Sequence, residues 1–125
     1  MSAGIGRRRW AIAAGHAPSR ANGSEPMFSS HDRLALLNAG PRLANVRITV
    51  FYADRKSVGP YRIGVAPRRV RNVRINDLIF PEAVRLDVPY GLRIESDEAV
   101  VAQFTRQDTR AAALAGLLCT AWAAD

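Results

Sequence analysis

The sequence contains few of the residues that build metal centres and disulfide frameworks. Its 125 residues include one cysteine, Cys119, and two histidines, His16 and His31. A lone cysteine cannot cross-link the fold internally, and four well-spaced ligands of suitable types are missing, so we expect no metal site and no cofactor. Cys119 also lies among apolar neighbours, which suits a reducing compartment.

Long hydrophobic runs are absent as well. The most apolar segment, residues 111–124, is interrupted by Gly116 and Thr120, whereas a membrane-spanning helix needs about 20 apolar residues. Near the N-terminus, Arg7–Arg9 precede an apolar stretch that is too short for a secretory signal. We therefore expect a cytoplasmic protein with neither a transmembrane segment nor an export signal.

Lysine is almost missing, because 17 of the 18 basic residues are arginines and only Lys56 is not. The formal net charge is +7. A genome that prefers arginine codons would produce this asymmetry without functional meaning. A surface that meets phosphates or carboxylates would also produce it, and composition alone leaves both interpretations open.

What the sequence does contain is a series of short alternating segments. From Leu34 onward, apolar and polar residues alternate between turn signals, which is typical of an antiparallel sandwich or barrel. The alternating segments are residues 10–14, 46–52, 61–65, 69–75, 90–94 and 100–106. We predict an all-β fold, an antiparallel, jelly-roll-like β-sandwich that forms a single domain over residues 1–125.

Two segments are harder to interpret. Residues 15–32 form a long polar stretch, which is either a functional loop or disordered. At the other end, the alanine-rich run after Asp108 favours a short C-terminal helix with Asp108 as its N-cap. The alternation of Leu118, Thr120 and Trp122 fits a final strand equally well, so the end of this segment stays open.

The chain offers no recognisable catalytic arrangement. Ser30, His31 and Asp32 are adjacent, and neighbours on one strand point to opposite sides, so they cannot form a triad together. No glycine-rich sequence is placed to hold a phosphate, because Gly4 and Gly6 precede three arginines and no helix. We expect a protein that is not an enzyme.

A mixed set of polar residues follows the predicted strands. Gln103, Thr105, Arg106 and Asp108 combine amide, hydroxyl, guanidinium and carboxylate groups near the strand ends, beside Asn76. Such a mixture can bind a small polyol or an anion through directed hydrogen bonds. The alternative is structural: Arg106 and Asp108 would form an internal salt bridge, and Asn76 would cap a turn.

The densest basic cluster lies on the predicted strand over residues 69–75. It consists of Arg68, Arg69, Arg71 and Arg74. Repeated by symmetry, these arginines could contact DNA phosphates. Most such clusters are simply solvated. No aromatic residue is interleaved with these arginines and no recognition-helix motif is visible, which makes DNA binding the less favoured interpretation.

Many short motifs in one order resemble the sensory rhodopsin transducer family. They are Ile5-Gly6-Arg7, Trp10-Ala11-Ile12-Ala13, Asn22-Gly23, Glu25-Pro26, Phe28, Ser30-His31, Leu37-Asn38-Ala39-Gly40, Val58-Gly59-Pro60-Tyr61-Arg62, Val73-Arg74, Asn76-Asp77-Leu78 and Thr105-Arg106-Gln107-Asp108. The resemblance implies a β-sandwich that assembles as a homotetramer in the cytoplasm. It also implies a signalling partner of a membrane-embedded sensory rhodopsin, and it carries links to DNA binding and to small, sugar-like ligands.

Together these observations indicate a binding and signalling protein, with DNA-binding regulation as the alternative. The candidate ligand-binding residues are Trp10, Asn22, Ser30, His31, Arg74, Asn76, Gln103, Thr105, Arg106 and Asp108. Arg106 is expected to contact an anionic or hydroxyl-bearing group, with Asn76 and Gln103 orienting it. Trp10 is expected to offer an apolar face to a ring.

Overall fold

The computed structural model describes residues 4–16, 31–85, 88–108 and 115–124, and within them it confirms an all-β architecture. The described elements are the strands β1 (Arg7–His16), β2 (His31–Asn38), β3 (Ala44–Tyr52), β4 (Val58–Val65), β5 (Arg69–Arg74), β6 (Pro89–Asp108), β7 (Ala115–Thr120) and β8 (Trp122–Ala124), and the single 3-10 turn η2 (Ile75–Asp77). All the described strand pairs are antiparallel.

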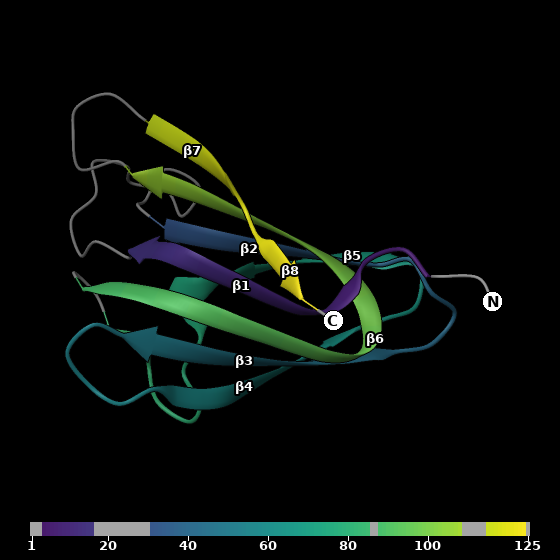
Figure 1. Cartoon of the computed structure of the whole chain (residues 1–125), viewed down its shortest axis with the longest axis horizontal. Helices are drawn as coiled ribbons and strands as arrows, with labels where there is room; N and C mark the ends of the chain where they lie inside the picture. Colours follow the sequence, from purple (N-terminus) through teal and green to yellow (C-terminus); the bar gives the residue numbers. More distant parts are fainter. Residues whose placement is uncertain (1–3, 17–30, 86–87, 109–114, 125) are drawn as a thin grey trace.

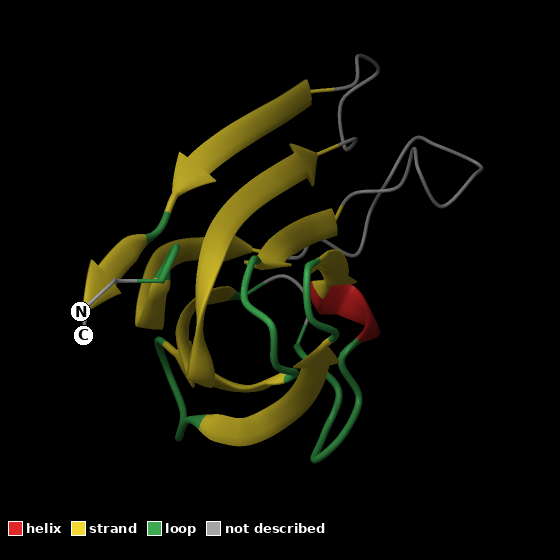
Figure 2. Ribbon diagram, turned by 90° about the vertical axis from the view of Figure 1, so that its right-hand side faces the viewer, coloured by secondary structure: helices red, strands yellow, loops and turns green. Residues whose placement is uncertain are grey.

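The strands form two sheets that share the long strand β6 (Figure 1). The first sheet has the order β4-β3-β6-β1-β8, and the second joins β5, β2, β6 and β7. Viewed from the end, the strands curve around the core (Figure 2). The architecture is therefore a sandwich whose two layers are continuous at one strand.

The core follows from the period of two in the strands. In β3, Val46, Ile48, Val50 and Tyr52 are buried, while Phe51 on the opposite side is exposed, as the alternation predicts. The core residues from both sheets include Ile12, Leu34, Leu36, Val46, Ile48, Val50, Tyr61, Ile63, Val73, Tyr90, Leu92, Ile94, Val100 and Phe104. Burying one such side chain contributes about 1.5 to 3 kcal/mol.

Strand β6 corrects the expectation of two separate strands. Residues 90–96 pair with β3 in the first sheet, and residues 101–107 pair with β2 in the second. Between them, the Asp97 carboxylate accepts hydrogen bonds from the backbone N–H and side-chain amide of Asn45, both at 2.8 Å. These bonds hold the pKa of Asp97 below its usual range. No turn separates the two halves of β6, because a single strand bends from the first sheet into the second.

The C-terminal segment is also a strand where it is described. Residues 115–120 form β7, which pairs with β6, and Trp122 begins β8, which pairs with β1. The expected helical start at residues 111–114 lies outside the described residues. Sheet pairing overrides the helix propensity of the leucines and alanines here, since propensity is worth only tenths of a kcal/mol per residue.

Candidate functional site

Three of the predicted binding residues meet on the outer face of the second sheet. In the strand register, Arg33 of β2 lies opposite Arg74 of β5 on one side and Thr105 of β6 on the other. One row further along, Ala35 lies between Asn72 and Gln103. We call Arg33, Asn72, Arg74, Gln103 and Thr105 the second-sheet cluster. It contains guanidinium, amide and hydroxyl groups around a small alanine.

The second-sheet cluster places two like charges side by side. Directly opposed residues on antiparallel strands have Cβ atoms about 5 Å apart, and like charges there are destabilising. Arg33 is exposed, and Arg74 is partly buried with a buried Nε atom. The arrangement can lower its electrostatic cost by binding an anion, with Gln103 and Thr105 available to hydroxyl groups.

This geometry corrects the position expected for Gln103 and Thr105. Both lie within β6, on its solvent-facing side, and not in loops at the strand end. The sequence pattern predicted two shorter strands, residues 90–94 and 100–106, and therefore placed Gln103 and Thr105 closer to a strand end than they are in β6. Their neighbour Arg33 was missed, because the pairing of β2 with both β5 and β6 is visible only in the fold.

The other predicted binding residues are not gathered at this cluster. Trp10 lies in β1 of the first sheet, where its Nε1 donates to the Val100 carbonyl at 2.9 Å and the Arg7 carbonyl at 3.2 Å. Asn76 lies in η2 and is partly buried. Asn22 and Ser30 lie outside the described residues.

For His31, Arg106 and Asp108 only the backbone is described. His31 begins β2 and pairs with Gln107, while Arg106 pairs with Asp32. Asp108 ends β6 and pairs with Ala115. Strand pairing therefore brings His31 and Arg106 to the same end of the second sheet.

The arginines proposed for DNA contact are spread along one edge. Arg68 precedes β5 with a positive φ of 55°, and its N–H donates to the Gly40 carbonyl at 3.2 Å. Arg69 and Arg71 are exposed in β5, and Arg71 donates to the Gly64 carbonyl at 2.7 Å. Arg74 belongs to the second-sheet cluster, where it lies opposite Arg33. The edge is strongly basic, but its arginines do not share one face.

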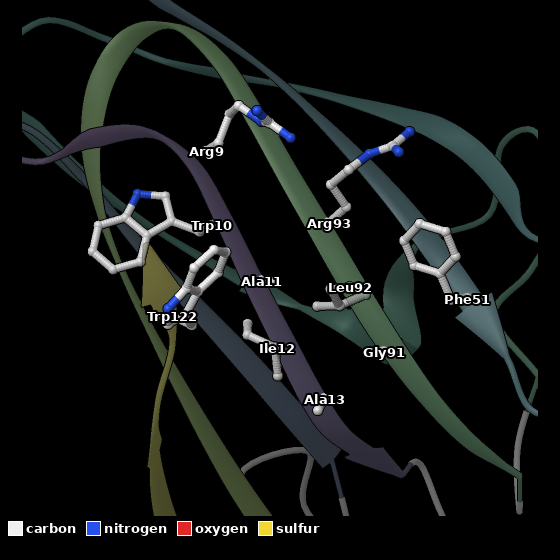
Figure 3. A pocket seen from close by; sticks show the side chains of 10 residues that line it. All are labelled: Arg9, Trp10, Ala11, Ile12, Ala13, Phe51, Gly91, Leu92, Arg93 and Trp122. Carbon is white, nitrogen blue, oxygen red and sulfur yellow. The ribbon is translucent and has the colours of Figure 1, made fainter. Parts of the chain in front are cut away.

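A groove on the outer face of the first sheet was not predicted (Figure 3). Its cavity volume is about 480 Å³, which is within the range of small-molecule sites. Trp122 and Phe51 form opposite walls, Ala11 and Gly91 lie between them, and Arg93 is at one end. We call this the aromatic groove. Trp10 also lines it, but Trp10 lies opposite the buried Ile94 and packs against the core, so the ring contact expected of Trp10 stays a prediction.

The sequence pattern also did not predict that the carboxylate of Asp32 is buried. Asp32 is completely buried, and its Oδ2 accepts hydrogen bonds from the Tyr90 hydroxyl at 2.5 Å and the His16 backbone N–H at 2.7 Å. Gly15 permits this packing, since a Cβ there would lie 2.3 Å from the Tyr90 ring. Asp32 thus joins β1, β2 and β6 at one end of the sandwich.

Metal-binding clusters and membrane-crossing helices are both missing from the described part of the chain. It contains no group of three or more acidic, histidine or cysteine side chains placed to hold a metal ion. In the same residues, no helix has the length and hydrophobicity required to cross a bilayer.

Comparisons with known proteins point to one family. The model of the Anabaena sensory rhodopsin transducer family matches residues 5–123. The structure of the Anabaena sensory rhodopsin transducer is 45% identical, with a TM-score of 0.75, covering 82% of this chain and 99% of that protein. The crystal structure of Thermotoga maritima 1070 is 27% identical, with a TM-score of 0.81, covering 96% and 97% respectively. No curated protein matches.

Proposed function

The chain belongs to the Anabaena sensory rhodopsin transducer family, and we propose on that basis that it is a cytoplasmic signalling protein that binds partners and catalyses no reaction. Its partner is the cytoplasmic face of a membrane-embedded sensory rhodopsin, and it assembles as a homotetramer. The observation that carries the proposal is the 45% identity over nearly the full length of a protein described as a sensory rhodopsin transducer.

Direct binding to a receptor tests this proposal. A sensory rhodopsin is reconstituted in lipid nanodiscs, and association of the purified protein is measured in the dark and under illumination. We expect saturable binding that exceeds binding to empty nanodiscs and changes with light. Equal binding to empty and loaded nanodiscs would contradict the receptor role. If the genome places a rhodopsin gene next to this one, its product is the receptor to use.

The second-sheet cluster supports a small polar ligand as part of the same signalling role. Its two arginines favour an anionic group, while Gln103 and Thr105 suit hydroxyl groups. Asn22, Ser30, His31, Asn76, Arg106 and Asp108 remain candidates for additional contacts, and Trp10 for a contact in the aromatic groove. A sugar acid or a sugar phosphate combines the required groups.

DNA binding is the second candidate function, favoured by the exposure of Arg68, Arg69 and Arg71. Each phosphate that the protein neutralises contributes about −0.9 to the slope of log K against log salt concentration. Several contacts therefore predict a steep slope, and Arg69→Gln should make it shallower by about one. A flat salt response would exclude this function.

A further inference from the structure

A row of charged side chains crosses the outer face of the first sheet. The register places Arg62 of β4 opposite Arg47 of β3, Arg47 opposite Glu95 of β6, and Glu95 opposite Arg9 of β1. Directly opposed residues project to the same side of a sheet. We call these four residues the arginine row. It crosses three inter-strand spacings, about 14 Å in all.

Arg93 adds a fourth guanidinium beside the row. Its Nε lies 3.3 Å from Glu95 Oε1, and its Nη2 donates to Thr49 Oγ1 at 3.4 Å. The same guanidinium lies 5.4 Å from the centre of the Phe51 ring. Among the described residues of this face, four arginines therefore accompany two carboxylates, Glu95 inside the row and the exposed Asp97, which is hydrogen-bonded to Asn45 one row away. The in-register Arg47 and Arg62 repel each other, so an anionic partner gains favourable contacts on this face.

The aromatic groove adjoins this charge surplus. Trp122 is 68% exposed and Phe51 is 40% exposed, although aromatic side chains of this size usually contribute to a core. The floor between them is made of small residues, Ala11 and Gly91 (Figure 3). Two aromatic walls above a small-residue floor can hold one bulky apolar side chain.

We propose that the outer face of the first sheet docks an acidic linear peptide segment that carries one bulky apolar anchor residue. The anchor occupies the aromatic groove, and flanking carboxylates contact Arg93 and the arginine row. This inference deepens the proposed signalling function and rests on it, since it states the chemistry of the partner segment.

The length of the row favours a peptide over a small anion. One carboxylate or phosphate cannot reach guanidinium groups distributed over about 14 Å. An extended peptide advances about 3.3 Å per residue, so acidic residues at successive same-side positions are about 7 Å apart and follow the row.

The position of Glu95 favours a peptide over a nucleic acid. Glu95 lies inside the row, between Arg47 and Arg9. A nucleic acid strand carries a phosphate at every nucleotide, so one of its charges would face this carboxylate. A peptide can place a neutral or basic residue there and keep acidic residues opposite the arginines.

Fluorescence anisotropy with a short labelled peptide tests the inference. The probe has glutamates on both sides of a central leucine. A second peptide replaces the glutamates by glutamine, a third replaces the leucine by serine, and a single-stranded oligonucleotide serves as the competing polyanion. We expect the glutamate peptide to bind at least about tenfold more tightly than either altered peptide, with affinity that falls as salt is added.

Matched variants locate the binding surface. Arg47→Gln and Trp122→Ser should each weaken the glutamate peptide about tenfold, as expected for central interface residues. Arg69→Gln makes the same charge change on the second sheet, and Phe80→Ser removes an aromatic ring that is 83% exposed elsewhere. Both controls should change the affinity less than about twofold. Thermal melts confirm that each variant remains folded.

The remaining outcomes overturn the inference. Equal binding of the glutamate and glutamine peptides would remove the role of the arginines. Oligonucleotide binding that is lost in Arg47→Gln, without peptide binding, would assign the face to nucleic acid. If light scattering shows that Trp122→Ser lowers the molar mass of the assembly, the outer face of the first sheet is an interface between copies of this chain. Nanodisc binding is measured separately, so a receptor that binds without any peptide affinity defeats this inference alone.

Discussion

At the scale of single residues, buried polar groups determine how the sandwich closes at one end. Asp32 accepts hydrogen bonds from Tyr90 and from the backbone of His16, so one carboxylate connects three strands. Tyr61 is similarly buried, and its hydroxyl donates to the Glu82 carbonyl at 2.5 Å. Each contact satisfies a group that would otherwise be costly to bury.

Replacing Asp32 should therefore destabilise the protein strongly. Asp32→Ala leaves the Tyr90 hydroxyl and the His16 N–H buried without this acceptor, and we expect a loss of about 3 kcal/mol in the free energy of unfolding. The adjacent Arg33→Ala, at an exposed position, should change it by less than about 0.5 kcal/mol. Urea denaturation measures both. Equal effects of the two substitutions would show that the buried carboxylate is unimportant for stability.

The stability contribution of Tyr61 should depend on pH. Burial raises the pKa of Tyr61 to about 12, whereas an unfolded tyrosine has a pKa of about 10. Only the protonated hydroxyl donates to Glu82, so its contribution is complete below pH 10 and is lost as the pH rises through 12.

Comparison with Tyr61→Phe isolates this effect. The difference in unfolding free energy between wild type and Tyr61→Phe should be constant below about pH 10 and should shrink above it. Urea denaturation over that range measures the difference. A difference that stays constant up to pH 12 would show that Tyr61 does not titrate with a raised pKa.

At the scale of elements, the bend in β6 decides the architecture. Its first half pairs with β1 and β3, and its second half pairs with β2 and β7. Strand β1 must follow the bend, and Gly6 precedes it with a φ of 101°. A Cβ at this position would lie 2.2 Å from the Val100 carbonyl oxygen. Only glycine permits such a close approach at this φ.

Substitution of Gly6 should accordingly disturb the start of β1. Gly6→Ala combines a strained φ with a backbone clash, and we expect it to cost about 2 to 4 kcal/mol. Gly4→Ala is the matched control, because its Cβ would lie 3.9 Å from Ala99 Cβ, an ordinary contact. Thermal unfolding compares the two. Similar melting temperatures for both variants would mean that β1 can shift at no cost.

At the scale of the whole molecule, the arginine excess is organised into separate surfaces. The first sheet carries the arginine row, and the second carries the facing pair Arg33 and Arg74. A preference for arginine codons would account for the number of arginines, but it would not by itself place two pairs in register. Because like charges in register are unfavourable, each pair is a place where we propose that an anionic partner binds.

Ligand-induced stabilisation tests the second of these surfaces. In a thermal-shift screen of sugars, sugar acids and small anions, a ligand at about 100 times its dissociation constant should add about 2.7 kcal/mol of stability. Arg33→Gln should abolish the shift, and Arg47→Gln on the first sheet should preserve it. A screen without any shift, or one in which both variants behave alike, would contradict ligand binding at the second-sheet cluster.

Local patterning in the sequence was enough to determine the fold class and the core side of some of the strands. The alternation over Val46–Tyr52 and over Val100–Thr105 predicted which side chains are buried, because the period of two belongs to the strand itself. The family motifs are also read directly along the chain, and the match of the family model to residues 5–123 confirmed the family resemblance.

Only the tertiary structure decided which strands meet and what surfaces they form. The sequence did not reveal that residues 90–106 lie in one bent strand, nor that Arg33 lies between Arg74 and Thr105. It also did not reveal the groove between Trp122 and Phe51. These features join residues that are far apart in the chain. Strand alternation predicts on which face of a sheet a residue lies, but not which residue lies beside it on the next strand. Sheet order and register supply the neighbour, and both depend on the packing of the complete core.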